Sequence, residues 1–346
     1  MKSLRKITQS NFFIRLSSWE YWPFGIIQFP LMLYFAWLAL RARSLFFFSA
    51  SNPGIQMGGM FGESKFKVLE KIPPEVKPKT ALVKLPTSTD NVVAILREHE
   101  FAFPVIFKPD LGERGHMVER INDEREVDQY LKKINIDFLI QDFVDLPLEF
   151  GIFYRRYPSQ KNGEVISIIQ KELLAVTGDG RSTLRDLILQ KPRAKLQWHK
   201  LKVSFQKQLD TVVPSGKRIQ LVDVGNHARG TKFTDGSRLL TERLSTTFDF
   251  ISKRIDGFYF GRFDLRCSSL EDLYAGRVRI VELNGCGAEP AHIYDPDFGL
   301  VRAMGVLFRY WRDIFVIARE NRRRGIPYLS MREGIQFYKK FKLATR

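Results

Sequence analysis

The sequence has little of what defines several common protein classes. It holds only two cysteines, Cys267 and Cys286, which are too few for a disulfide framework and lack the spacing of a zinc site. It has no Gly-Lys-Ser/Thr ending of a Walker A loop, no motif for reading RNA or DNA, and no Ser/His/Asp or Cys/His constellation. These absences exclude disulfide-stapled domains and zinc domains, and the cysteine usage fits a reducing, cytoplasmic compartment.

Long apolar runs are also scarce, and the segment nearest to a membrane span is interrupted. A span needs about 20 consecutive apolar residues. Residues 19–40 approach that length, but Pro23, Pro30, Glu20 and Gln28 break the run. Aromatic residues at its start and arginines after its end resemble interfacial anchors. Three interpretations of this segment stay open: a monotopic or re-entrant anchor, a true span, and a buried helix of an N-terminal subdomain.

What the chain has in excess is positive charge. Its 346 residues carry a formal net charge of +17, which favours an acidic partner such as nucleic acid, an anionic membrane surface or a phosphorylated substrate. The basic residues gather near both ends of the chain, at residues 5–15, 41–43, 322–324 and 339–346. Since no nucleic-acid motif accompanies them, we expect no nucleic-acid partner, and this distribution favours phospholipid headgroups.

The length suits two or three subdomains, and a hydrophobic content of 44% indicates a globular chain. Apolar periodicity, capping residues and turn signals predict an α+β fold. Expected strands cover residues 45–50, 103–108, 138–143, 149–157 and 165–171, and expected helices cover residues 65–71, 87–99, 124–133, 182–189 and 302–319.

Two short segments near the C-terminus carry the strongest chemical signal. GRFDLR contains Arg262 and Asp264, and VRIVELNG contains Glu282 and Asn284. Side chains alternate across a strand, so paired strands would present two carboxylates, an amide and a guanidinium on one face. Oxygen ligands suit Mg²⁺, and arginine can hold a phosphoryl or carboxylate oxygen through two hydrogen bonds. The pattern therefore predicts an ATP-using site.

Two earlier segments add candidate ATP ligands. In FPVIFKPDLGERGHMV, Lys108 ends a strand, and Gly112 and Gly115 let the following loop approach a phosphate closely. In FLIQDFVDLPLEFGIF, apolar side chains offer a slot for adenine, and Glu149 offers a carboxylate for ribose hydroxyls. Each segment has a plain alternative: a surface hairpin with a solvated lysine, and a solvent-facing loop.

Taken in this order, the motifs resemble the ATP-grasp superfamily, and most of all its D-alanine–D-alanine ligase branch. The resemblance runs from about residue 65 to residue 284. It implies an ATP-grasp fold in which two α+β subdomains clamp ATP. It also implies a ligase that joins a carboxylate to an amine, or to a thiol, through an acyl phosphate with two Mg²⁺ ions, for which Mn²⁺ could substitute.

The resemblance also implies an organisation of the chain. The clamp would occupy residues 80–325, with its first subdomain at residues 80–145 and its second at residues 146–325. A hydrophobic, basic segment at residues 1–44 and a short subdomain at residues 45–79 would precede it, and a basic tail at residues 326–346 would follow.

Roles follow from the resemblance residue by residue. Asp264, Glu282 and Asn284 would bind the metals, and Arg262 would stabilise the transferring phosphoryl group or the acyl oxyanion. The expected ATP contacts are Lys65, Lys108, Gly112, Glu113, Arg114, Gly115, Gln141, Asp142, Phe143, Val144 and Glu149.

A second likeness, to ligases of the cyanophycin-synthetase and glutamate–cysteine-ligase type, lies in VTGDGRSTLRDLI. It implies that Lys171, just before this stretch, is a further phosphate ligand. The later segment VDVGNHARGTKFTD would lie beside the acyl phosphate. There Asn226, Arg229 and Lys232 would hold a substrate carboxylate, and Arg229 would also act in catalysis.

The sequence departs from the D-alanine ligases in ways that bear on substrate. Gln141 and Asp142 stand where Glu and Lys are common, and Glu113 and Arg114 replace small loop residues. GCGAEP replaces the Ser-Pro-Gly turn that helps to seat D-alanine, so D-alanine is not expected as the substrate. Two other functions stay open: a kinase that phosphorylates a hydroxyl, and a non-catalytic nucleotide-binding protein at the membrane surface.

Overall fold

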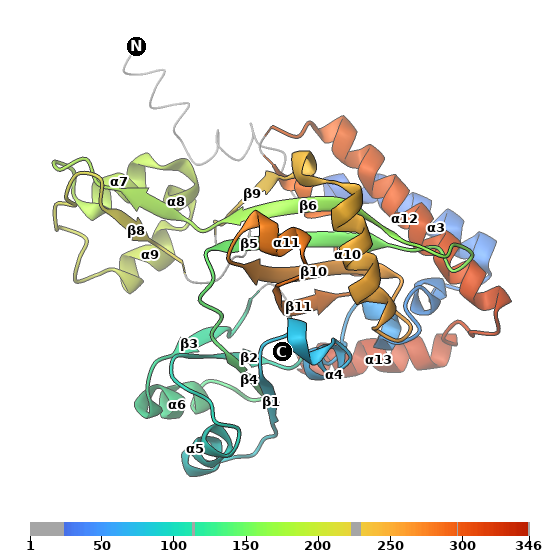
Figure 1. Cartoon of the computed structure of the whole chain (residues 1–346), viewed down its shortest axis with the longest axis horizontal. Coiled ribbons are helices and arrows are strands. Elements are labelled where there is room, and N and C mark those ends of the chain that lie inside the picture. The colour runs from blue at the N-terminus through green and yellow to red at the C-terminus, as the bar shows by residue number, and fades with distance from the viewer. Residues whose placement is uncertain (1–23, 113–114, 223–229, 296, 345–346) are drawn as a thin grey trace.

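The structure is a computed structural model that describes residues 24–112, 115–222, 230–295 and 297–344. In this part of the chain the strands form a four-stranded, a five-stranded and a two-stranded sheet (Figure 1). The strands are β1 (Thr80–Val83), β2 (Val105–Pro109), β3 (Glu119–Ile121), β4 (Phe138–Asp142), β5 (Leu148–Arg155), β6 (Glu164–Glu172), β7 (Ala175–Thr177), β8 (Arg218–Gln220), β9 (Lys232–Asp235), β10 (Phe260–Cys267) and β11 (Arg279–Asn284).

Helices flank all three sheets, which confirms the α+β class. The α-helices are α3 (Phe24–Ala42), α4 (Lys65–Glu70), α5 (Thr89–Glu98), α6 (Glu124–Leu131), α7 (Leu184–Gln190), α8 (Pro192–Leu196), α9 (Trp198–Ser204), α10 (Glu242–Lys253), α11 (Leu270–Tyr274), α12 (Leu300–Arg323) and α13 (Met331–Ala344). Short 3₁₀ helices are η2 (Phe47–Ala50), η3 (Gln56–Gly59), η4 (Pro74–Val76), η6 (Ser237–Leu239) and η7 (Ala291–Tyr294).

The four-stranded sheet has the order β1-β4-β2-β3 and is antiparallel throughout. The predicted helices α5 and α6 begin at capping side chains: Ser88 accepts from the backbone N–H of Asn91, and Asp123 accepts from that of Glu126. Such caps satisfy N–H groups that have no partner within the helix. Both helices pack apolar residues against Phe107 and the other buried side chains of this sheet.

The five-stranded sheet has the order β11-β10-β5-β6-β9, and all of its pairs are antiparallel. The two predicted strands β5 and β6 pair with each other near its centre. Helix α10 covers one face, and α12 with α3 lies over the other (Figure 1). On that second face Tyr310 of α12 packs its ring against Phe153 and Phe260, with centroid distances of 6.3 and 5.4 Å.

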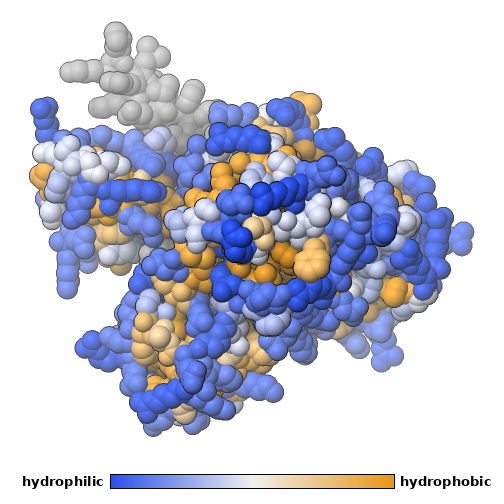
Figure 2. Space-filling model, in the orientation of Figure 1, coloured by the Kyte–Doolittle hydropathy of each residue, from blue (hydrophilic) through white to orange (hydrophobic). Residues whose placement is uncertain are grey.

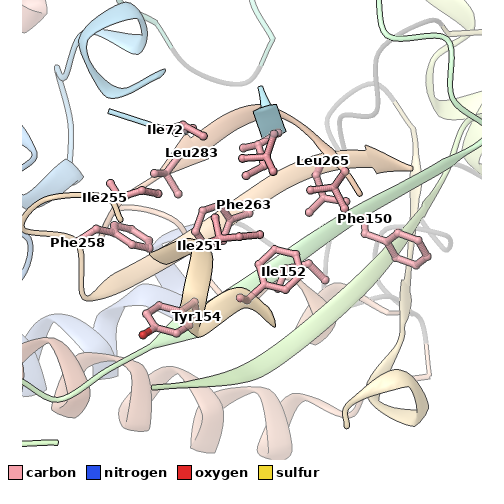
Figure 3. Packing of buried hydrophobic residues seen from close by; sticks show 14 of the residues in the cluster. Ile72, Phe150, Ile152, Tyr154, Ile251, Ile255, Phe258, Phe263, Leu265 and Leu283 are labelled. Atoms are coloured by element: carbon pink, nitrogen blue, oxygen red, sulfur yellow. The ribbon is translucent and has the colours of Figure 1, made fainter. Parts of the chain in front are cut away.

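The main apolar core lies between this sheet and α10 (Figure 3). Ile152 of β5, Phe263 and Leu265 of β10, and Ile251 of α10 are all at most 3% exposed. Burial of one such side chain stabilises the fold by about 2 kcal/mol. Because side chains alternate along a strand, the inward placement of Phe263 and Leu265 directs the residues between and beside them to the opposite face of the sheet.

A small lobe is inserted between β6 and β9, comprising β7, α7, α8, α9 and β8 (Figure 1). It has its own core, which includes Leu184, Ile188 and Leu201. Thr183 caps α7 and forms a reciprocal capping box with Asp186 at the start of this predicted helix.

The strand predicted at residues 45–50 is wrong, because residues 47–50 form the 3₁₀ helix η2. Phe47 and Phe48 are both buried, although they are consecutive. A short run that is apolar on every side cannot distinguish a buried strand from a buried helix by its periodicity. Among the described residues, no helix has both the length and the apolar composition needed to cross a bilayer.

Candidate functional site

The predicted pairing of the two C-terminal motif strands is confirmed. In the antiparallel register of β10 and β11, Arg262 lies opposite Asn284, and Asp264 lies opposite Glu282. Arg262 donates from both Nε and Nη2 to the Asp264 carboxylate at 3.1 Å, and Asn284 Nδ2 donates to Asp264 Oδ2 at 3.0 Å. Asp264 is only 3% exposed, so the arginine and the amide fix its carboxylate at the floor of the site.

An irregularity in this pairing directs a backbone carbonyl toward the other sheet. The register shifts after Asp264, which leaves Val281 as the extra residue of a β-bulge. The Val281 carbonyl accepts from Lys108 Nζ at 2.9 Å and from Gln141 Nε2 at 3.4 Å. Lys108 Nζ also donates to Gln141 Oε1 at 3.0 Å. The predicted strand-end lysine therefore connects the four-stranded sheet to β11.

Lys65, the first residue of α4, lies at the same place. Its Nζ is 3.1 Å from Glu282 Oε1 and donates to the Gly112 carbonyl at 2.8 Å. Asp110 Oδ1 accepts from the Ser64 hydroxyl and from the Phe66 N–H, both at 2.9 Å. These bonds join the start of the glycine loop to the start of α4, beside the β11 carboxylate.

Glu149 belongs to a buried ion cluster. Lys171 Nζ lies 3.2 Å from Glu149 Oε1 and 3.0 Å from Asp264 Oδ1. Arg266 Nη2 lies 2.9 Å from Glu149 Oε2, and Arg266 Nη1 donates to the Val144 carbonyl at 3.0 Å. Arg266 is not among the predicted site residues, although strand alternation puts it on the face of Arg262 and Asp264.

The contacts of the other predicted site residues do not bring them together in the same way. Asp142 ends β4 half-buried, and the Phe143 ring lies 4.4 Å from the guanidinium carbon of Arg120. Gly115 follows the undescribed part of the loop, and Lys232 begins β9 opposite Glu172. Glu113, Arg114, Asn226 and Arg229 lie outside the described residues.

Burial and ion pairing set the charge states of the site. Burial lowers the pKa of Lys108 to about 8, against the attraction of Glu282. Burial alone would raise the pKa of Glu282, but Lys65 and Lys108 hold it well below its usual range. Burial opposes the charge of Lys171, yet Asp264 and Glu149 raise its pKa above the ordinary value. Glu282 thus stays ionised at neutral pH. Among the three lysines of the site, Lys108 has its pKa lowered, whereas Lys65 and Lys171 have theirs raised.

The oxygen donors fit a hard divalent cation. Glu282 Oε2 and Asn284 Oδ1 accept no hydrogen bond from any described residue, and they lie two positions apart on one face of β11. Asp264 lies opposite Glu282 and accepts from Asn284, so it adds a carboxylate to this group, although both of its oxygens are engaged by cations. No group of three or more His, Cys, Asp or Glu side chains with metal-binding geometry occurs among the described residues. The set suits Mg²⁺, which binds one or two carboxylates and completes its shell with phosphates and water.

Two glycine-rich segments contact each other just after the end of β11. The N–H groups of Cys286 and Gly287 donate to the carbonyls of Gly58 and Gly59 at 3.0 and 2.7 Å. A Cβ on Gly285 would lie 2.4 Å from the Gly58 oxygen, so this contact requires glycine. The sequence signal was the recurrence of glycine in GG and GCG, but sequence alone does not show that the two segments meet.

The loop after β11 also reaches back to the site. The Glu289 carbonyl accepts from Arg262 Nη1 at 3.3 Å. Its side chain accepts from the Tyr294 hydroxyl and from Gln28 Nε2 of α3, the latter at 3.3 Å. Glu289 therefore connects the Arg262 guanidinium to helix α3.

The sequence matches no protein-family model and no curated protein. Solved structures do match at low identity. They include a bifunctional glutathione synthetase from Pasteurella multocida (TM-score 0.37, 16% identity, 71% of this chain and 36% of that one). A VanG D-Ala:D-Ser ligase from Enterococcus faecalis matches with TM-score 0.41 and 11% identity over 74% of this chain and 64% of that one. A D-alanine–D-alanine ligase from Bacillus anthracis matches with TM-score 0.39 and 13% identity over 78% of this chain and 70% of that one.

These matches are remote, and the first two span less than two thirds of the proteins matched.

Proposed function

We propose that this chain is an ATP-dependent ligase of the ATP-grasp type, which joins a substrate carboxylate to an amine through an acyl phosphate. One observation carries the proposal. The β10–β11 pair presents Arg262, Asp264 and Glu282 on one face, and Lys108 of the other sheet reaches the same strand at Val281. Two sheets thus contribute cationic and oxygen groups to one place, as a site between two subdomains requires.

The lysines would bind the triphosphate in this proposal. Lys65, Lys108 and Lys171 now satisfy their charge on protein oxygens, and phosphate oxygens would replace some of these contacts. The segment Gln141 to Val144 would line the adenine, with the glycine loop over the phosphates. Glu149, expected to hold ribose, would have to exchange an ion pair for ribose hydroxyls.

Asp264, Glu282 and Asn284 would hold Mg²⁺, or Mn²⁺, which when bound neutralises the charge that develops on the transferring phosphoryl group. Arg262 is held by two hydrogen bonds to Asp264, so its guanidinium is fixed at the site before any ligand arrives. A fixed cation stabilises developing charge without reorganisation during the reaction.

The proposed reaction needs no side-chain nucleophile. A carboxylate oxygen of the substrate attacks the γ-phosphorus, the bond from that phosphorus to the bridging oxygen breaks, and ADP leaves. The amine nitrogen of the second substrate then attacks the acyl carbon, loses a proton and releases phosphate. The protein holds the reacting groups together and excludes water, and such positioning can supply much of the rate.

A screen of phosphate release tests the proposal. Wild-type protein with ATP and Mg²⁺ is presented with amino acids, dipeptides and sugar acids, each with amine acceptors. We expect phosphate release that needs both substrates, and its loss in Asp264→Ala and in Glu282→Ala. Glu124→Gln, on the exposed start of α6, is the matched control. Full turnover in both site variants would contradict the proposal, and ADP with a phosphorylated product but no free phosphate would identify a kinase instead.

A further inference from the structure

Helix α3 presents a row of large apolar side chains to solvent. Phe29, Leu33, Trp37 and Leu40 recur every three or four residues and are 62%, 60%, 48% and 78% exposed. That spacing puts them on one side of a helix, and Met32 beside them is 64% exposed. The opposite side of α3 is covered, since residues such as Leu31 and Leu38 are 1% exposed.

This concentration differs from the character of one face of the molecule. The face of the molecule drawn in Figure 2 is largely hydrophilic, with hydrophobic residues in smaller areas. Contiguous exposed apolar surface on a soluble protein marks an interaction site more often than chance exposure does. The row on α3 therefore needs a partner whose surface is apolar.

Basic residues border the C-terminal end of the row. The Arg41 guanidinium lies over the ring of Trp37 at 4.7 Å and near that of Phe315 of α12 at 5.4 Å. Arg319, one turn further along α12, lies 5.5 Å from the same Phe315 ring. Arg43 is exposed just beyond α3. An apolar row that ends in tryptophan and arginine matches the apolar interior, interface and anionic headgroups of a bilayer.

A second amphipathic helix, α13, lies against the segment that follows α3. Gly334 of α13 lies so close to Phe46, just after α3, that a Cβ would be 2.4 Å from its ring. On α13, Met331 and Ile335 are 51% and 42% exposed. Basic side chains accompany them on the same helix, as in helices that lie in a membrane interface.

We propose that the exposed face of α3 docks on an anionic phospholipid bilayer, with Phe29, Leu33 and Leu40 entering the headgroup–acyl boundary and Arg41 pairing with lipid phosphates. This inference is independent of the ligase proposal. The docked helix borders the candidate site, because Gln28 of α3 donates to Glu289, whose carbonyl accepts from Arg262.

Vesicle flotation of the full chain tests the docking. We expect the wild type to float with vesicles in which roughly one third of the lipid is phosphatidylglycerol, and to float less with phosphatidylcholine alone. The double variant Leu33→Glu/Leu40→Glu should bind at least about tenfold more weakly, because two apolar insertions are lost. Phe250→Glu on α10, where Phe250 is 64% exposed, is the matched control and should float like the wild type.

A charge pair of variants separates the electrostatic part. Arg41→Glu/Arg43→Glu should lose the preference for anionic lipid, whereas Arg97→Glu on α5, whose side chain is 76% exposed, should keep it. Salt at about 1 M should also weaken binding. Circular dichroism and thermal melts verify that each variant is folded.

Two results would overturn the proposal. One is that the wild-type protein floats with neither kind of vesicle. This result is expected if residues 1–23 or a second copy of the chain cover the exposed face of α3. Light scattering would identify the second copy, as a dimer that Leu33→Glu/Leu40→Glu converts to a monomer. The other is undiminished flotation of Leu33→Glu/Leu40→Glu.

Discussion

Lys171 Nζ lies 3.0 Å from Asp264 Oδ1 and 3.2 Å from Glu149 Oε1, so one buried ammonium joins three neighbouring strands of the five-stranded sheet. All three side chains are at most 11% exposed. At the floor of the candidate site, the ammonium and the two carboxylates therefore compensate one another's charges. An incoming phosphate or metal ion must replace some of these ion pairs in order to bind.

The first prediction concerns this cluster. Lys171→Met removes the charge shared by two buried carboxylates, each of which keeps one arginine partner. We expect the free energy of unfolding to fall by about 2 kcal/mol, less than the cost of a fully uncompensated buried charge. Urea denaturation measures this loss. Lys132→Met, at a side chain that is 72% exposed, should change stability by less than about 0.5 kcal/mol. An unchanged urea midpoint in Lys171→Met would show that the cluster is not structural.

The second prediction is the pH dependence of ATP affinity. Burial lowers the pKa of Lys108 to about 8, so the free protein loses this positive charge as the pH rises through that value. Phosphate binding favours the ammonium and raises its pKa, so the bound state holds the extra proton. ATP affinity should be constant below pH 8 and fall by up to about tenfold per pH unit above it.

Lys108→Arg provides the control for this pH dependence, because arginine stays protonated throughout the range. Calorimetric titrations between about pH 7 and pH 10 should give a much flatter profile for this variant. A wild-type affinity that does not change with pH, or the same slope in both proteins, would refute the role of the Lys108 proton.

The third prediction tests the core that holds β10 in place. Phe263 is 0% exposed and its ring lies 5.5 and 5.4 Å from those of Phe248 and Phe258. Phe263→Ala should lower the free energy of unfolding by about 4 kcal/mol, through lost burial and a residual cavity. Phe250→Ala, at a side chain 64% exposed, should cost less than about 1 kcal/mol. Equal losses of unfolding free energy in the two variants would mean that Phe263 is not packed in a buried core.

The fourth prediction concerns the segment before α4. Asn52 is fully buried and donates to the carbonyls of Gly58 and Phe260 at 2.8 Å, while its oxygen accepts from the N–H groups of Tyr259 and Phe260. Asn52→Ala leaves these backbone groups unpaired and should cost about 3 kcal/mol, measured by thermal or urea unfolding.

The matched control for this amide is Asn91→Ala, at an exposed position of α5. It should melt within a few degrees of the wild type. If Asn52→Ala also melts within a few degrees of the wild type, the buried amide does not anchor the segment to β10.

Local signals account for the part of the fold that the sequence predicts. The caps Ser88 and Thr183 act within one helical turn, and alternation in GRFDLR and VRIVELNG is a property of each strand alone. The pairing of those strands follows because both carry compatible polar faces. None of these inferences requires knowledge of distant contacts.

The remaining features depend on contacts between residues far apart in sequence. Arg266 reaches Glu149 across 117 residues, and Gln28 reaches Glu289 across 261. Phe47 and Phe48 adopt a 3₁₀ helix because several elements enclose them, which periodicity does not encode. Similarly, the composition of α3 left a buried helix and a membrane contact equally open, since only the tertiary structure shows which of its faces is covered.

Binding of ATP in the presence of Mg²⁺, measured by isothermal titration calorimetry, tests the central claim most directly. The convergence of Lys65 and Lys108 on β11 predicts saturable binding at one site in the wild type. It predicts an affinity at least about tenfold lower in Lys65→Met/Lys108→Met, because two charge-assisted contacts are lost. Lys132→Met should bind as the wild type does. No binding by the wild type, or equal affinities in all three proteins, would contradict the claim that these strands and lysines form a nucleotide site.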